Sequence, residues 1–209
     1  MERVAAYIDG FNLYNGIMEA EWRHYLWLDL RKMVEALLLP EQELVGVTYY
    51  TARVGKPFES VERQRRYLDA LEHRDGLTVV YGTCVYEDED CKSCGRTWSR
   101  RTEKKTDVGI AVGLLTQVGR YDAALLISGD SDLVPAVNAI EALPNKRVIN
   151  AAPPRRVSKE LKQRSSSHFV INETTLRESQ FPSVVSTAPG YAVVQPVEWC
   201  ADPDTPLTR

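Results

Sequence analysis

The stretch AALLISGDSDLVP, residues 123–135, decides the fold expected for this chain. Its first five residues, 123–127, are all apolar, which is typical of a strand buried on both faces of a parallel sheet. A short turn with a glycine and an aspartate follows. Ser131 is suited to cap the next helix, and Pro135 comes early enough in that helix to be tolerated. The stretch therefore predicts a strand, an acidic turn and a helix in succession.

The same alternation extends through much of the chain. Short apolar runs that suit buried strands are residues 4–8, 45–51, 77–81, 123–127 and 147–151. Segments with helical periodicity lie between them, at residues 28–39, 59–74, 106–118 and 131–143. Strands that alternate with helices predict parallel βαβ units. We therefore expect a three-layer α/β domain with a central, mainly parallel sheet.

Length and composition set the class of protein. The chain has 209 residues, of which 44% are hydrophobic, and this is enough for one ordinary buried core. The net charge of -3 excludes a basic surface over the whole chain, so contacts with nucleic acid must come from local patches. We find no signal-peptide pattern and no apolar segment long enough to span a bilayer. These features predict a cytoplasmic protein without a membrane partner, whose four cysteines are thiols or metal ligands.

Three aspartates follow the ends of predicted strands. Asp9 comes directly after the run 4–8, and Asp130 and Asp132 follow the run 123–127. In open parallel sheets the ligand site lies beyond the carboxyl ends of the strands, so the three carboxylates are expected at one edge. Carboxylate oxygens select hard cations such as Mg²⁺ or Mn²⁺. Such ions orient a phosphodiester and generate hydroxide from bound water, which makes nucleic-acid hydrolysis the expected reaction.

Asp107 opens the predicted helix 106–118 and is the fourth carboxylate of interest. On a 3.6-residue period it shares a face with four apolar residues, which we expect to pack on the sheet: Ala111, Leu114, Leu115 and Val118. An aspartate on such a face is costly unless it is paired or bound to a cation. The alternative is a helix N-terminal aspartate favoured by the macrodipole. Together with the other three aspartates, Asp107 favours a metal site.

Three separated segments resemble a known family. They are YIDGFNLY at 7–14, EKKTDV at 103–108 and LISGDSDLVP at 126–135, and they resemble the signature segments of the NYN domain, in the LabA-like branch of the PIN-like nucleases. The resemblance covers about residues 1–175. It implies a PIN-like Rossmannoid fold and a metal-dependent ribonuclease. By this resemblance Asp9, Asp107 and Asp130 are the core metal ligands, Asp132 supports a second metal or the water, and Asn12 contacts substrate or a ligand.

Residues 84–103 interrupt the alternation and are rich in charge and cysteine, so we interpret them as an inserted loop or knuckle. The segment CKSCG at 91–95 has the spacing of half a zinc knuckle. Cys84 is a candidate third ligand beside Cys91 and Cys94. The fourth ligand stays open: it is His73, an acidic residue of 87–90, Cys200 or a residue of a second subunit. The alternative is a loop with reduced thiols, and similar inserts in LabA-like relatives favour a structural Zn²⁺.

Basic residues gather just before Asp107: Arg96, Arg100, Arg101, Lys104 and Lys105. Charge clusters are usually solvated surfaces, but this one adjoins a proposed ligand and is expected near the metal edge. There Lys105 is placed to neutralise a scissile phosphate. Trp98 lies within the cluster, and it either stacks on an unpaired base of single-stranded RNA or packs the insert.

We assign residues 1–178 to the nuclease domain and 179–209 to a proline-rich C-terminal tail, extended or partly disordered. Two other functions compete with a ribonuclease. One is a non-catalytic RNA-binding or scaffold protein on the same fold. The other, less favoured, is a phosphomonoesterase of the haloacid dehalogenase type, in which Phe11 occupies the place of a required second aspartate. The sequence leaves a homodimer open.

Overall fold

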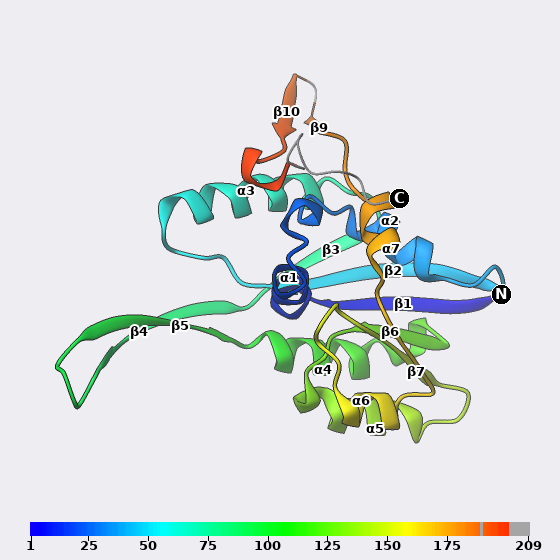
Figure 1. Ribbon diagram of the computed structural model, residues 1–209. Helices are drawn as coiled ribbons and strands as arrows, with labels where there is room; N and C mark the ends of the chain where they lie inside the picture. Colours follow the sequence, from blue (N-terminus) through cyan, green and yellow to red (C-terminus); the bar gives the residue numbers. More distant parts are fainter. Residues whose placement is uncertain (189, 201–209) are drawn as a thin grey trace.

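The centre of the computed structural model, which describes residues 1–188 and 190–200, is a six-stranded sheet of order β3-β2-β1-β6-β7-β8 (Figure 1). Every neighbouring pair in this sheet is parallel, which confirms the predicted parallel α/β fold. The strands are β1 (Glu2–Asp9), β2 (Gln42–Thr51), β3 (Leu77–Tyr81), β6 (Ala123–Ile127), β7 (Arg147–Ala152) and β8 (Ser167–Val170).

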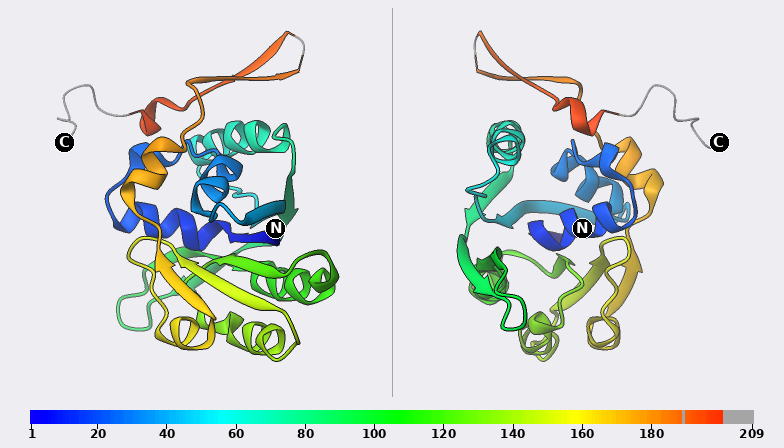
Figure 2. Two further views of the ribbon diagram at one scale, coloured as in Figure 1. Left: turned by 90° about the vertical axis from the view of Figure 1, so that its right-hand side faces the viewer. Right: turned by 60° about the vertical axis from the view of Figure 1, so that its left-hand side comes forward.

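Helices cover both faces of the sheet, as the three-layer prediction requires (Figures 1 and 2). On one face lie α1 (Gly10–Glu19), α2 (Leu30–Leu37), α3 (Phe58–Glu72) and α7 (Glu173–Glu178). On the other lie α4 (Thr106–Thr116), α5 (Val134–Glu141) and α6 (Lys159–Arg164). Within the described ranges, no helix combines the length and apolar character needed to cross a membrane.

The apolar runs in the sequence arise because helices pack on both faces of the central strands. Along β1, Val4, Ala6 and Ile8 enter the core under α1 to α3, whereas Ala5 and Tyr7 enter the core under α4 to α6. Side chains alternate between the two faces of a strand, so a strand covered on both sides is apolar at every position. The same reason accounts for the uninterrupted run in β6.

The insert predicted at residues 84–103, as a loop or knuckle, is an antiparallel hairpin of β4 (Thr83–Asp90) and β5 (Thr97–Lys104). The hairpin extends away from the sheet (Figure 1). Its base is fastened to the loop after β2, where the Tyr86 hydroxyl accepts the backbone N–H groups of Gly55 at 2.7 Å and Lys56 at 3.1 Å. These partners are about 30 residues away in sequence, so local patterning did not reveal them.

The C-terminal segment packs onto the domain over the part that the structure describes. It forms a second hairpin of β9 (Val184–Ala188) and β10 (Tyr191–Val194), followed by the 3₁₀ turn η4 (Val197–Trp199). Phe181, Val193 and Trp199 are buried in the core under α1 to α3. The predicted tail thus contains two described strands, and its residues 201–209 lie outside the described range.

Candidate active site

The site forms beside β1, where the order of the strands in the sheet reverses. Strand β1 pairs with β2 on one side and with β6 on the other, so the chain connections leave this point in opposite senses. In open parallel sheets such a switch point opens a crevice at the carboxyl ends of the strands. Ile8 and Ile127 are register partners, so Asp9 and Ser128, which follow them, emerge side by side.

Asp9 is held firmly at this edge. It is only 4% exposed, and it caps α1 by accepting the Asn12 backbone N–H at Oδ1, 2.9 Å away. Its second oxygen, Oδ2, accepts the Ser128 hydroxyl at 2.9 Å. The carboxylate is therefore fixed by one donor from its own helix and one from the neighbouring strand.

The loop after β6 is fixed by the same two residues. The Ser128 hydroxyl oxygen accepts the Asp130 N–H at 3.0 Å, and the Asn12 Oδ1 accepts the Gly129 N–H at 3.0 Å. The resemblance implied that Asn12 contacts substrate or a ligand; in the structure its side-chain carbonyl oxygen accepts the Gly129 N–H of this loop. Asn12 thus joins the start of α1 to the turn that carries Asp130.

A third strand supports that turn from behind. Asn150 of β7 is fully buried and donates its side-chain N–H groups to the backbone oxygens of Ser128, at 2.9 Å, and Leu126, at 3.2 Å. Its Oδ1 accepts from the His168 Nδ1 at 2.8 Å. Sequence reasoning missed both Ser128 and Asn150. The available signal was a polar residue at or within an otherwise apolar buried run, since such a residue must find a hydrogen-bond partner.

Two glycines allow the loops to approach the edge this closely. A Cβ atom on Gly129 would stand 1.9 Å from the Arg156 backbone oxygen, and one on Gly10 would stand 2.6 Å from the Tyr50 backbone oxygen. Backbone atoms cannot move aside as a flexible side-chain end can. Any larger residue at either position would push the turn that carries Asp9 or Asp130 away from its place.

Asp130 is half-buried and begins the 3₁₀ turn η3 (Ser131–Leu133), where its Oδ1 accepts the Asp132 N–H at 2.9 Å. The predicted helix cap at Ser131 is therefore wrong by one residue, because the aspartate supplies the capping oxygen instead. Asp132 itself is exposed. Both carboxylates stand beyond the end of β6, as the strand-end argument predicted.

Asp107 lies at the start of α4, but the predicted sheet-facing stripe is wrong by one residue. The buried positions of α4 are Thr106, Ile110, Gly113 and Leu114, while Leu115 is 42% exposed. Asp107 is exposed beside this stripe instead of heading it. Lys105 precedes the helix with a φ of 79°, and this left-handed residue sets the direction in which α4 begins. The expectation of a costly buried Asp107 is thereby corrected to a carboxylate at the rim.

The aspartates act on one another electrostatically. Burial above all, together with the charges of Asp107 and Asp130, raises the pKa of Asp9 to about 6. The pKa of Asp107 is also raised, first by the partial loss of water around this carboxylate at the rim and then by the charges of Asp130 and Asp132. Like charges held near one another disfavour the ionised form, so these shifts place the four carboxylates in a shared field.

Within the described residues, no ion pair joins any of these four aspartates to a lysine or arginine. In the same part of the chain, no three His, Cys, Asp or Glu side chains stand close enough to hold one metal ion as they are oriented. The carboxylates therefore gather at one edge without forming a preassembled cage.

The basic cluster is divided by the hairpin. Lys105 is exposed and sits at the head of α4 beside Asp107, as predicted. Trp98 is 46% exposed and lies six residues up β5 from Lys104, about 20 Å away at the usual rise of a strand. The expectation that Trp98 lies near the aspartates is therefore wrong. The side chains of Arg100 and Arg101 lie outside the described residues.

The hairpin also separates the cysteines. Cys84 is at the base of β4, seven residues from Cys91, which corresponds to about 23 Å along an extended strand. Cys84 therefore cannot share an ion with Cys91 and Cys94, and that part of the zinc prediction is wrong. At the tip, the Gly95 N–H donates to the Cys91 backbone oxygen at 2.8 Å, and Gly95 has a φ of 69°. The pKa of the Cys91 thiol is lowered, chiefly by the Cys94 N–H.

An open parallel sheet with acidic residues at its switch point defines a Rossmann-like α/β protein with a candidate cation site. The chain belongs to the NYN domain family, whose model matches residues 3–173. This family is part of a nuclease superfamily, as the three signature segments implied.

Two relatives are similar to this chain over nearly its whole length, at low sequence identity. The chain is 25% identical to 6-hydroxy-3-succinoylpyridine 3-monooxygenase HspA of Pseudomonas putida, over 97% of this chain and 77% of that protein. It is 26% identical to the low amplitude and bright protein LabA of Synechococcus elongatus, over 91% of this chain and 96% of that one. A solved structure of a protein of unknown function from Vibrio parahaemolyticus superposes with a TM-score of 0.57 at 24% identity, covering 82% of this chain and 94% of that chain, which shows the shared fold.

Proposed function

We propose that this protein is a metal-dependent ribonuclease in which Asp9, Asp107, Asp130 and Asp132 hold Mg²⁺ or Mn²⁺. The observation that carries the proposal is the gathering of four carboxylates from three separate segments at the switch point, with raised pKa values for Asp9 and Asp107 and no basic partner in the described part. A bound divalent cation would supply the missing positive charge.

The residues fit such an ion even though no three of the described ligands stand together. Mg²⁺ keeps several of its waters and is commonly bound through one or two carboxylates together with substrate phosphates. Asp9 and Asp130 are the two carboxylates fixed by hydrogen bonds, at Oδ1 and Oδ2 of Asp9 and at Oδ1 of Asp130. Asp107 and Asp132 are exposed and free to turn toward a cation or its waters.

In the proposed reaction, the residues of this chain would have separate roles. Ser128 and the Asn12 N–H orient Asp9, while the Asn12 side chain keeps the Asp130 turn in place. Lys105, at the positive end of the α4 dipole, offers a charge to the scissile phosphate. When bound, the divalent cation supplies Lewis acidity and a lowered pKa for its water.

The experiment that tests this function is cleavage of a labelled single-stranded RNA with Mn²⁺ or Mg²⁺, with and without EDTA. We expect metal-dependent cleavage of RNA that EDTA abolishes. The same assay includes DNA of the same sequence and a small phosphomonoester, because these separate a ribonuclease from a general nuclease and from a phosphatase. RNA binding without cleavage in any metal would sink the proposal and support the scaffold alternative.

The names of the two relatives describe different roles, and a shared fold does not fix the reaction. A hydroxylated pyridine, incubated in air with a nicotinamide reductant because a monooxygenase consumes O2 and two electrons, therefore belongs beside the assay as a small-molecule control. Its disappearance on chromatography, with RNA left intact, would favour an activity like the one in the name of the Pseudomonas relative.

We also propose that Cys91 and Cys94 form half of a structural Zn²⁺ site at the hairpin tip, completed by a residue of a second subunit. The turn around Gly95 and the lowered pKa of Cys91 support a thiolate pair. Elemental analysis of the purified protein is expected to find up to one zinc per chain. The double variant Cys91→Ser, Cys94→Ser should lose this zinc, whereas Cys84→Ser, at the base of the hairpin, should keep it. Equal, negligible zinc in all three proteins would leave only a thiol-containing turn.

A further inference from the structure

A cavity of about 110 Å³ lies between α1 and α3, over the carboxyl end of β2. Helix α1 lines it with a stripe of residues at a spacing of three and four, Gly10, Leu13, Tyr14 and Ile17, and with Phe11 beside them. Gly10 directly follows Asp9, so this stripe begins at the acidic edge and runs inward from it. One wall of the cavity is therefore continuous with the candidate active site.

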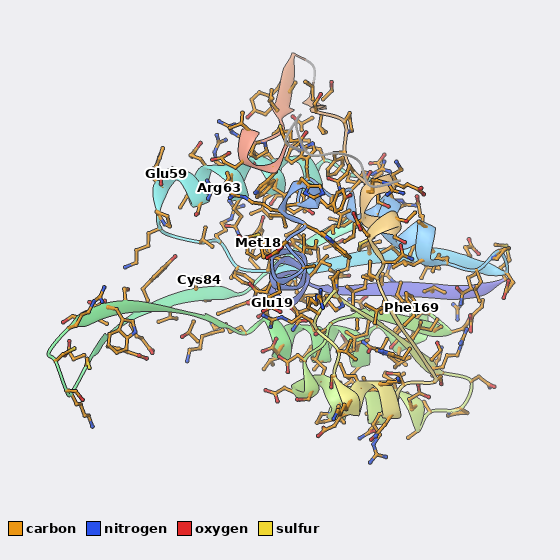
Figure 3. The ribbon with its side chains drawn as sticks, in the orientation of Figure 1. Met18, Glu19, Glu59, Arg63, Cys84 and Phe169 are labelled. Atoms are coloured by element: carbon orange, nitrogen blue, oxygen red, sulfur yellow. The ribbon has the colours of Figure 1, made fainter. Side chains whose placement is uncertain are left out.

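Helix α3 supplies the facing wall with the same spacing, through Ser60, Arg63, Gln64 and Tyr67. In parallel βαβ units the helix after each strand begins at the carboxyl edge, and α1 and α3 follow β1 and β2 in this way. Ser60, in the first turn of α3, and Gly10 thus mark the end of the cavity nearest the aspartates. Figure 3 shows Arg63 and Glu59 on α3, with Met18 and Glu19 on α1.

The interior of the cavity is aromatic and apolar. Tyr49 of β2 lines it, and Trp199 of the C-terminal segment lines it beside Tyr67, with their ring centroids 5.8 Å apart. Arg63 fastens this C-terminal wall through an ion pair of 2.9 Å with Glu198. Flat, apolar walls of this kind suit an aromatic ring system, which they hold by stacking and by exclusion of water.

Two long polar side chains at the cavity, Gln64 and Arg63, are already engaged by the protein. The Gln64 side chain donates to the Ala52 backbone oxygen at 2.9 Å and accepts the Val54 N–H at 2.8 Å. Arg63 also donates to the Ser60 hydroxyl at 3.0 Å. Recognition here would therefore rest on ring shape and stacking, which every base offers, instead of on a hydrogen-bond code.

We propose that this cavity receives one unpaired nucleobase of the strand whose phosphate lies at the aspartates. The inference rests on the proposed nuclease function and adds a base subsite to it. A strand bound at Asp9 would place a neighbouring nucleotide at Gly10 and Ser60, and unstacked bases of single-stranded RNA are commonly held on aromatic side chains. The subsite predicts a preference for single strands, because a paired base cannot leave its duplex without cost.

The test uses single-stranded RNAs in which one nucleotide at a time lacks its base, cleaved with Mn²⁺. For the wild type we expect kcat/KM to fall about tenfold when one particular base near the cut is missing, on the scale of one lost base–aromatic stack. Ser60→Tyr fills the mouth and should cut intact and abasic RNA at the same reduced rate. Glu59→Tyr adds the same group one residue away, on an exposed position, and should keep the wild-type dependence on the base.

A second variant and a binding measurement distinguish failure of the base subsite from failure of the proposed nuclease activity. Tyr14→Ala removes a 40% exposed wall of the mouth, and it replaces Ser60→Tyr if thermal melting shows that variant to be unfolded. Adenosine monophosphate should quench the tryptophan fluorescence saturably in the wild type, where Trp199 lines the cavity, and not in the blocked variant. Cleavage of all abasic RNAs at the parent rate overturns the subsite and leaves the nuclease intact. Saturable binding of the nucleotide without any RNA cleavage overturns the nuclease and leaves the pocket.

Discussion

RNA cleavage by the Asp130→Asn variant is expected to fall by about 10²-fold or more, the scale of losing one electrostatic contact to a developing charge. Asparagine has the size of aspartate and keeps the Oδ1 that accepts the Asp132 N–H, so the 3₁₀ turn after β6 keeps its cap. What the substitution removes is one negative charge. A loss of cleavage would therefore report on the charge at this position and not on a collapsed loop.

Thermal melting provides the second measurement on this variant. Asp130 raises the pKa values of Asp9 and Asp107, so removal of its charge relieves repulsion in the metal-free protein, which should melt no lower than the wild type. Added Mn²⁺ should raise the melting temperature of the wild type more than that of the variant, because only the wild type keeps the full ligand set. The matched control is Asp75→Asn, an exposed aspartate before β3, which should change neither quantity. An Asp130→Asn enzyme with wild-type cleavage and wild-type metal response would remove Asp130 from the site.

The centre of the sheet was predictable because strands β1, β6 and β7 are buried on both sides, whereas the edge strands β3 and β8 are partly exposed. The runs 77–81 and 123–127 match β3 and β6 residue for residue, and 4–8, 45–51 and 147–151 lie within β1, β2 and β7. A strand covered on both faces excludes polar residues along its length, so its limits are visible as a change in composition. Helix α1 was missed because it begins directly after Asp9, without the intervening loop that usually marks a helix start.

The two hairpins were not predictable from local pattern. The ribbon of β4 and β5 has no apolar face to produce period-two alternation, and its base is fixed by Tyr86 through contacts with Gly55 and Lys56. The C-terminal segment contains few helix formers, and what orders it is the distant contact of Trp199 with the core. Both depend on residues far apart in sequence, which propensity and spacing do not report.

In the candidate site, too, some residues could be placed from the sequence and others could not. Asp9 and Asp130 could be placed because strand ends fix them, and the register of β1 with β6 does bring their turns together. The orientation of α4 could not be derived, because Lys105 in a left-handed conformation turns the helix so that Thr106 and Ile110 face the sheet in place of Asp107. The supporting shell of Ser128 and Asn150 acts through hydrogen bonds that exist only in the folded chain.

The Trp27→Ala substitution is expected to lower the free energy of unfolding by about 3–5 kcal/mol, the usual cost of emptying a buried tryptophan site. Trp27 is fully buried, and its indole N–H donates to the Pro182 backbone oxygen at 2.8 Å. Its ring lies 5.7 Å from that of Phe181 and 6.5 Å from that of Trp199. The substitution therefore removes packing and one hydrogen-bond donor from the junction between the core and residues 179–200.

Urea unfolding of Trp27→Ala, with Trp98→Ala as the matched control, measures this cost. Trp98 is 46% exposed on the hairpin, so its removal should leave the free energy of unfolding within about 0.5 kcal/mol of the wild type. A chain ending at Glu178 should be destabilised as well, because it loses Phe181, Val193 and Trp199 from the same core. If the shortened chain has the same midpoint of urea unfolding as the wild type, residues 179–200 do not contribute to the stability of the domain. If it unfolds at a lower concentration, as we expect, the structural domain continues past the family match at residue 173 and includes the wall of the α1–α3 cavity that Trp199 provides.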